Sequence, residues 1–129
     1  MATYSKITLQ PTAGTTTSGI PINVTGVSGS PTVIHTTQTS ATAFDEIWLY
    51  ATNTYTSQIT LTIQVGGGSG SAPANQITMT IPAQSGLTLV VPGLILAGTG
   101  SAGNTVTAFY VTTGGYGYIN IFGYVNRVQ

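Results

Sequence analysis

Hydrophobic and polar residues alternate one by one in several parts of the chain. The clearest segments are 58–65 and 76–81, in which isoleucine, leucine or methionine alternates with threonine or glutamine. Successive side chains of an extended strand point to opposite faces, so this two-residue period predicts strands with one buried face. Together with residues 87–91, these segments predict the core, with aromatic cover from the C-terminal strand. The predicted core residues are Ile59, Leu61, Ile63, Ile77, Met79, Ile81, Leu87, Leu89 and Val91.

Further strand signals occur along the whole chain, and glycine or proline interrupts every stretch before a helix could form. They lie at residues 7–9, 20–27, 32–37, 44–52, 94–96, 105–112 and 118–128. No window has the spacing of an amphipathic helix. Eight or nine short strands separated by turn residues are typical of an antiparallel β-sandwich. We therefore predict an all-β fold, an antiparallel β-sandwich, and a jelly roll of two four-stranded sheets fits the count.

The segment 44–52 is apolar on both faces of the strand that it predicts. Trp48 and Tyr50 share one face, and Ile47 and Leu49 share the other. We expect such a strand to be covered on one side by a second sheet and on the other by a loop or another subunit.

Residues 1–19 contain few large apolar side chains and include the loop-forming run TAGTTTSG at 12–19. We therefore predict that 1–19 is an N-terminal arm that orders on a neighbour, and that 20–129 is a single β-sandwich domain. A chain of 129 residues is long enough for one such domain with its own core.

Charge is nearly absent from this chain and is balanced, because its only charged residues are Lys6, Asp45, Glu46 and Arg127. They make up 3% of the residues, against roughly 25% in an ordinary soluble domain. Two cations cannot form the basic surface that nucleic acid requires. The lack of cysteine excludes disulfides and cysteine-based zinc sites. No apolar run approaches the ~20 residues of a membrane span, and residues 1–11 lack a secretory signal, so we expect neither membrane insertion nor export.

Two motifs that resemble catalytic or cofactor sites lack the context that those sites need. The G-x-G-x-x-G pattern at 98–103 precedes a predicted strand, whereas a dinucleotide site needs a helix there. His35 has only Asp45 and Glu46 as possible carboxylate partners, and neighbouring strand residues face opposite surfaces. We therefore expect a loop at 98–103 and a solvated or interface histidine at 35. We predict that the protein is not an enzyme and has no catalytic, cofactor-binding or metal-binding residue.

A surface almost without charge suits a protein that works inside a large assembly, because interface cores are depleted of charged residues. We expect a homo-oligomer held by apolar and neutral polar contacts. The aromatic residues leave one alternative open, since tryptophan and tyrosine side chains also form platforms that stack on sugars. The candidates for such a platform are Trp48, Tyr50, Tyr55, Tyr110, Tyr116, Tyr118 and Tyr124.

Three segments resemble a small family of tailed-bacteriophage virion proteins. They are FDEIWLYATNT (44–54), ITMTIPAQSGLTLVVPGLIL (77–96) and INIFGYVNRV (119–128), and residues 1–43 lie outside the resemblance. The resemblance implies a capsid cement or decoration protein, made in the host cytoplasm, that binds the major capsid protein on the outer surface of the virion. It also implies that the expected homo-oligomer is a trimer. Its alternative implication is a head-fibre or tail-associated module that contacts a host glycan. The family has no catalytic motif, so no site residue is transferred.

Overall fold

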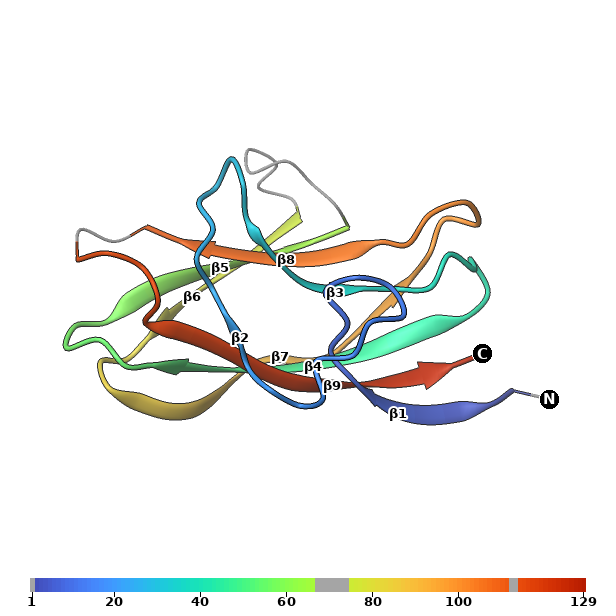
Figure 1. Ribbon diagram of the computed structural model, residues 1–129, viewed down its shortest axis with the longest axis horizontal. Coiled ribbons are helices and arrows are strands. Elements are labelled where there is room, and N and C mark those ends of the chain that lie inside the picture. The colour runs from blue at the N-terminus through green and yellow to red at the C-terminus, as the bar shows by residue number, and fades with distance from the viewer. Residues whose placement is uncertain (1, 67–74, 112–113) are drawn as a thin grey trace.

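The computed structural model describes residues 2–66, 75–111 and 114–129, which form two antiparallel sheets packed face to face (Figure 1). The predicted all-β antiparallel sandwich is therefore confirmed, and the described residues contain no α-helix. The strands in these ranges are β1 (Tyr4–Thr8), β2 (Ile22–Asn23), β3 (Thr32–Thr36), β4 (Phe44–Asn53), β5 (Ile59–Val65), β6 (Gln76–Ile81), β7 (Ser85–Ala97), β8 (Thr105–Tyr110) and β9 (Ile119–Val128).

The two sheets are built by nested pairing of early strands with late ones. One sheet has the order β1-β9-β4-β7, with β2 also beside β9, and the other has the order β3-β8-β5-β6. Thus β1 pairs with β9, β3 with β8, β4 with β7 and β5 with β6. This nesting brings the two termini together (Figure 1), where the backbones of Thr3 and Gln129 exchange hydrogen bonds.

The core lies between the sheets and is formed by the inward positions of each strand. In β4 the buried residues alternate strictly with half-buried ones, so Ile47 and Leu49 face the second sheet. The prediction is confirmed for five core residues, which are Ile59, Leu61, Ile63, Ile81 and Val91. Ile77 and Met79 are only half-buried and pack against the margin of the core.

The prediction is wrong for Leu87 and Leu89, whose side chains are 63% and 47% exposed. Tyr50 pairs with Leu89 and its neighbour Leu49 pairs with Val91, so Val90 is an extra residue in β7. A β-bulge of this kind shifts the alternation of the strand by one position. Val90 and Val91 are both buried as a result, and the two leucines face outward.

The predicted N-terminal arm is also wrong, because residues 4–8 form β1 within the five-stranded sheet. All five residues pair with β9, and Leu9 is 2% exposed in the same core cluster as Val24. An added edge strand is held largely by backbone hydrogen bonds, which need few large side chains. The low apolar content of residues 1–19 therefore did not distinguish an arm from an edge strand.

Candidate functional site

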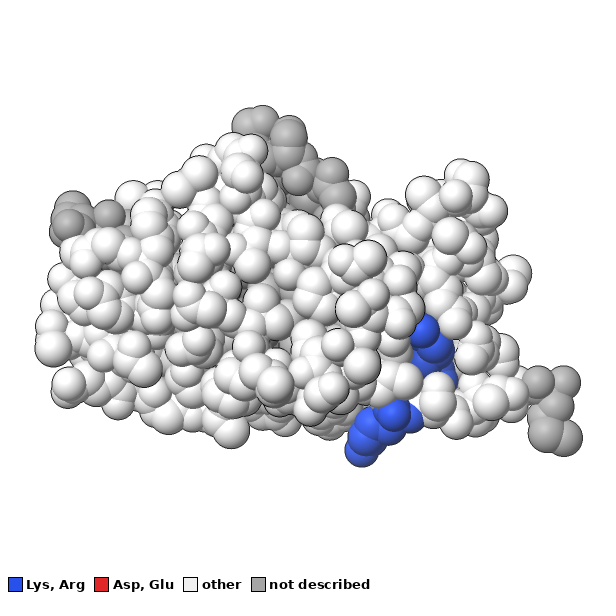
Figure 2. All heavy atoms as spheres, in the orientation of Figure 1, with Lys and Arg blue, Asp and Glu red and all other residues white. Residues whose placement is uncertain are grey.

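All four charged residues lie at the end of the five-stranded sheet where the termini meet. The register places Asp45 of β4 beside Arg127 of β9, and it places both Glu46 of β4 and Lys6 of β1 beside Asn126 of β9. Basic atoms in Figure 2 appear only toward this end of the molecule, and the remaining described atoms in that view are neutral. Strand alternation divides the charges, since Asp45 and Arg127 are buried between the sheets while Glu46 and Lys6 lie on the outer face.

The inner group is a buried ion pair with a histidine attached. Arg127 Nε donates to Asp45 Oδ1 at 2.7 Å, and its Nη2 donates to Oδ2 at 2.8 Å. His35 Nε2 lies 2.7 Å from the same Oδ2. The three residues are 0–7% exposed, so their charges are almost removed from water.

The hydrogen bonds define the tautomer of His35. The backbone N–H of Gln10 donates to Nδ1 at 3.1 Å, so Nδ1 is an acceptor and the proton of the neutral ring is on Nε2, facing Asp45. Both ring nitrogens are thereby engaged, which leaves neither to activate a serine hydroxyl. The arrangement is suited to holding residue 10 against β3 rather than to general-base chemistry.

The expectation of a solvated or interface histidine is wrong, because His35 is completely buried. The register of β3 is irregular between Val33 and His35, and the neighbours Ile34 and His35 are both buried. Simple alternation would have placed these two side chains on opposite faces.

Asp45 remains a carboxylate despite its burial. Burial by itself raises the pKa of this group, but the hydrogen bonds and charges of Arg127 and His35 together outweigh burial and lower the pKa below its usual value. The inner group therefore contains one negative and one positive charge and is neutral overall.

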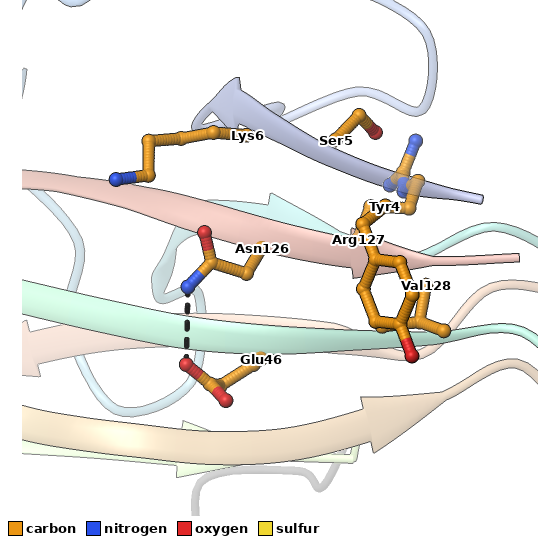
Figure 3. A pocket seen from close by; sticks show the side chains of 7 residues that line it. All are labelled: Tyr4, Ser5, Lys6, Glu46, Asn126, Arg127 and Val128. Atoms are coloured by element: carbon orange, nitrogen blue, oxygen red, sulfur yellow. Dashed lines mark hydrogen bonds between the residues drawn. The ribbon is translucent and has the colours of Figure 1, made fainter. Parts of the chain in front are cut away.

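The outer group is a carboxylate held against an aromatic pair. Trp48 Nε1 and Asn126 Nδ2 both donate to Glu46 Oε1, at 2.5 and 3.1 Å, and the second bond is drawn in Figure 3. The bond from Trp48, followed by that from Asn126, lowers the pKa of Glu46. Trp48 stacks on Tyr124 with ring centroids 6.2 Å apart, and Lys6 Nζ lies 4.8 Å from the centre of the Tyr124 ring.

Apolar side chains occupy the middle of the outer face, between the charged end and the polar residues Thr52 and Asn120 at the other end. In the rows next to Trp48, the register brings Tyr50, Phe122 and Leu89 side by side, and Pro92 lies beside Trp48. Tyr4, Leu87 and Ile95 are 76%, 63% and 59% exposed. The prediction that β4 has two apolar faces is confirmed, and its outer face is only partly covered by the described residues.

Two glycines, one in β7 and one in β9, let these strands pack closely against Trp48 of β4. Gly93 has a φ of +86° and is another extra residue in β7, and a Cβ there would meet Trp48 Cζ2 at 3.1 Å. At Gly123 a Cβ would meet the carbonyl oxygen of Trp48 at 2.3 Å. Glycine at both positions therefore allows β7 and β9 to pass close to Trp48.

At the charged end, the outer face is hollowed into an open cavity of about 350 Å³. Figure 3 shows Lys6, Asn126 and Glu46 on three adjacent strands around it. The full lining is Tyr4, Ser5, Lys6, Glu46, Asn126, Arg127 and Val128. The lining includes two cations, Lys6 and Arg127, of which Arg127 is paired with Asp45, together with the carboxylate of Glu46 and neutral hydrogen-bonding groups. Such groups suit contact with another polar surface.

The other sequence motifs do not add a site. Residues 98–103 form the loop that leads from β7 in one sheet to β8 in the other, and a strand follows it as predicted. Residues 2–66, 75–111 and 114–129 contain no cluster of three or more His, Cys, Asp or Glu side chains. Within the same ranges, no helix has the length and hydropathy of a membrane span.

Sequence reasoning missed the pairing of Asp45 with Arg127 and the outer set of Lys6, Glu46 and Asn126. A signal for the first was present, since Asp45 is in phase with Ile47 and Arg127 is in phase with Val125. A charged residue at an inward position needs a buried partner of opposite charge, and the chain offers few choices.

Comparison of the chain with protein-family models, curated proteins and solved structures finds no match.

Proposed function

We propose that this protein is a structural protein of a phage virion, a cement or decoration protein bound without covalent bonds to the outside of the capsid lattice. The single observation that supports this most is the outer face of the five-stranded sheet, which exposes aromatic and aliphatic side chains in adjacent rows. Contiguous apolar surface of this kind marks an interaction site. Because it extends over adjacent strands of the sheet, this surface suits another protein better than a small substrate.

The small number of charges supports attachment through apolar contacts. Asp45 and Arg127 neutralise each other inside the sandwich, so only Lys6 and Glu46 can take part in ionic contacts at the surface. Exposed ion pairs contribute only about 0–1 kcal/mol each. Binding must come instead from buried apolar area and neutral hydrogen bonds, repeated over the copies of a homo-oligomer and over many lattice sites.

The strand order supports the finer topological proposal, which is a jelly roll. A long hairpin that wraps around itself pairs its first strand with its last, its second with the last but one, and so on inward. The pairs β1–β9, β3–β8, β4–β7 and β5–β6 have this order when β1 and β2 count as one interrupted strand. Jelly rolls are common building blocks of viral capsid proteins.

The test is the number of copies in purified virions. A stained gel, calibrated with the purified protein, should show it at a fixed ratio to the major capsid protein that corresponds to tens or hundreds of copies. A particle with only a few copies would contradict decoration of the lattice.

One observation favours a second candidate, a head-fibre or tail-associated module that binds a host glycan. The Trp48–Tyr124 pair lies beside Glu46 and Asn126, and sugars are bound by stacking on aromatic rings next to polar side chains. This function predicts few copies per particle and binding of the purified protein to host cells, with loss of binding in Trp48→Ala.

A further inference from the structure

We infer that β6 pairs edge to edge with β6 of a second copy of the chain, around a two-fold axis at Met79, so that two four-stranded sheets join into one. The inference rests on the proposed function in one respect, because it specifies a contact within the proposed homo-oligomer. That contact is two-fold, whereas the resemblance implies a trimer.

The free edge of β6 lacks the features by which sheets usually prevent further pairing. Among the described strands, β6 pairs with β5 on one side and with no strand on the other (Figure 1). All six of its residues pair with β5 without a register shift, and none of them is charged or a proline. A regular, uncharged edge of this kind is a template for an added strand.

The other edge strands of the two sheets are protected. β1 contains Lys6, β2 has only two residues, and β7 contains Pro92 and several register shifts. β3 has an irregular register, and its edge is covered, since the backbone N–H of Thr36 donates to the carbonyl oxygen of Gln10. Charge, shortness, proline, bulges and a covering segment all block strand addition. This contrast indicates that the edge of β6 is used for pairing.

The sequence of this edge is self-complementary, because residues 77–81 read Ile-Thr-Met-Thr-Ile in both directions. In an antiparallel pair of such strands centred on Met79, Ile77 lies opposite Ile81 of the second copy, and Thr78 lies opposite Thr80 of the second copy. The two positions of each pair differ by an even number of residues, so inward side chains meet inward ones. For the same reason, the backbone groups that point outward from one strand meet those of the other.

On the outer face, the pairing extends rows of threonine across the two-fold axis. Thr60 of β5 pairs with Thr80 of β6, and Thr62 pairs with Thr78. Each row of the joined sheet then continues from Thr60 and Thr80 of one copy to Thr78 and Thr62 of the other. Thr78 and Thr80 are exposed within one copy, and cross-strand threonine pairs stabilise a sheet.

On the inner face, the pairing covers apolar side chains at the open side of the sandwich. Ile77 and Met79 are half-buried and pack against the margin of the core. A cavity of about 320 Å³ opens beside Ile77 and is lined also by Val65 and Leu94. The second copy places Ile81 opposite Ile77 and its own Met79 opposite Met79. Apolar area that one copy leaves in water is therefore buried in the dimer.

The geometry of the pair suits attachment to a lattice. A two-fold axis that relates paired strands in this way is perpendicular to the sheet, so the five-stranded sheets of both copies lie on the same side of the joined sheet. Their apolar outer faces then point the same way, and one dimer can bind a capsid at two points. The contact itself is short, about 17 Å with about four to six backbone hydrogen bonds, so we expect a weak dimer in solution.

The first test uses cysteine cross-linking, since the natural chain has no cysteine. Thr78→Cys and Thr80→Cys are made as separate variants. Position 78 of one copy lies opposite position 80 of the other, with Cα atoms about 4.5–5.5 Å apart, within the range of a disulfide. In two copies of the same variant, the cysteines are about 8 Å apart, beyond that range.

An equal mixture of the two variants should therefore form a disulfide-linked dimer under mild oxidation about ten-fold or more faster than either variant alone. The matched control mixes Thr80→Cys with Thr60→Cys, because Thr60 is exposed on the same face but lies one strand away from the edge. A mixture that cross-links no faster than its components, or no faster than the control, would overturn the inference.

The second test measures the mass of the purified protein by light scattering between about 10 and 500 μM. We expect the average mass to rise from the chain mass of 13.2 kDa toward twice that value. Thr78→Lys combined with Thr80→Lys places like charges opposite each other and should raise the dimer dissociation constant about ten-fold or more. The control combines Thr60→Lys with Val33→Lys, which adds the same charge at exposed positions of β5 and β3, and should dimerise like the wild type.

These outcomes are separate from the fate of the proposed function. A wild-type monomer at about 500 μM, or a trimer, would overturn the inference even if purified virions contain many copies. A dimer with the expected cross-link that is absent from virions would leave the inference standing and overturn the function. Protection of the β6 amides from hydrogen exchange only on capsids would assign this edge to the capsid protein and overturn the inference.

Discussion

Replacing Asp45 by asparagine tests whether the buried charge of Arg127 depends on this carboxylate for its stability. The side chain keeps its shape but loses its negative charge. In the wild type both carboxylate oxygens accept hydrogen bonds from Arg127 or His35, and in the variant an amide nitrogen replaces one of these oxygens. Arg127 would then be a buried cation without a counterion, and a donor would face a donor.

The expected loss in the free energy of unfolding is about 3–5 kcal/mol, because removal of one member of a buried ion pair leaves the other charge uncompensated. Domains are typically stable by only 5–15 kcal/mol. For a domain of this length, such a loss lowers the melting temperature by roughly 10–25 °C.

The pH dependence of stability provides an independent check. The pKa of Asp45 is lower in the folded state than the ordinary aspartate value of 3.8, because the hydrogen bonds and charges of Arg127 and His35 outweigh its burial. Its contribution to stability is therefore fully present above the unfolded pKa and is lost as the pH falls from about 4 through the folded pKa. The wild type should lose stability over this acid range, and Asp45→Asn should lose much less.

Urea unfolding followed by circular dichroism between pH 2.5 and 7 measures both effects. The matched control is Glu46→Gln, the same chemical change on the next residue of β4, whose half-buried side chain lies on the outer face. The glutamine keeps an oxygen that can accept from Trp48 and Asn126 and leaves no buried charge without a partner, so its cost should be far smaller than that of Asp45→Asn. A cost below about 1 kcal/mol for Asp45→Asn at pH 7 would refute the reasoning, and so would an unchanged acid profile.

Three further predictions concern the core, the first strand and the attachment to particles. Leu61→Asp buries a carboxylate at a fully buried position and should abolish cooperative melting, whereas Leu87→Asp, at a position 63% exposed, should lower the melting temperature far less. Deletion of residues 1–10 should clearly destabilise the isolated protein, since it removes β1, Leu9 and the donor to His35. An unchanged melting curve would instead support the prediction that residues 1–19 are an arm outside the domain. Washing purified particles in up to about 1 M salt should release little of the protein, because few charges are available to be screened, and complete release would show that charges of the partner dominate.

The sequence was most informative where strands alternate without interruption. The burial of β4 follows the two-residue period, which is why Ile47 and Leu49 were placed correctly on one face and Trp48 and Tyr50 on the other. In β5 the predicted core residues Ile59, Leu61 and Ile63 are buried, although Thr62 and Gln64 of the other face are buried as well. The period failed where the backbone gains a residue. Val90 is extra in β7, so Leu87 and Leu89 moved to the outer face, and the irregular register of β3 buried His35.

The candidate site could not be assembled from the sequence because its members are far apart in the chain. Asp45 and Arg127 are separated by 82 positions, and Lys6 reaches the same end of the sheet only because β1 and β4 both pair with β9. Local patterns do not determine which distant strands become neighbours. Alternation does give the face on which each charge lies once the strands are known.

The most direct measurement of the central claim is binding of the purified protein to heads that lack it, which are produced by a phage with the gene for this protein deleted. We predict saturable binding at a stoichiometry that matches the capsid lattice, little change between low and high salt, and a higher temperature of head disruption after binding. Heads that bind none of the protein at tens of micromolar, together with binding of the same protein to host cells, would contradict the account.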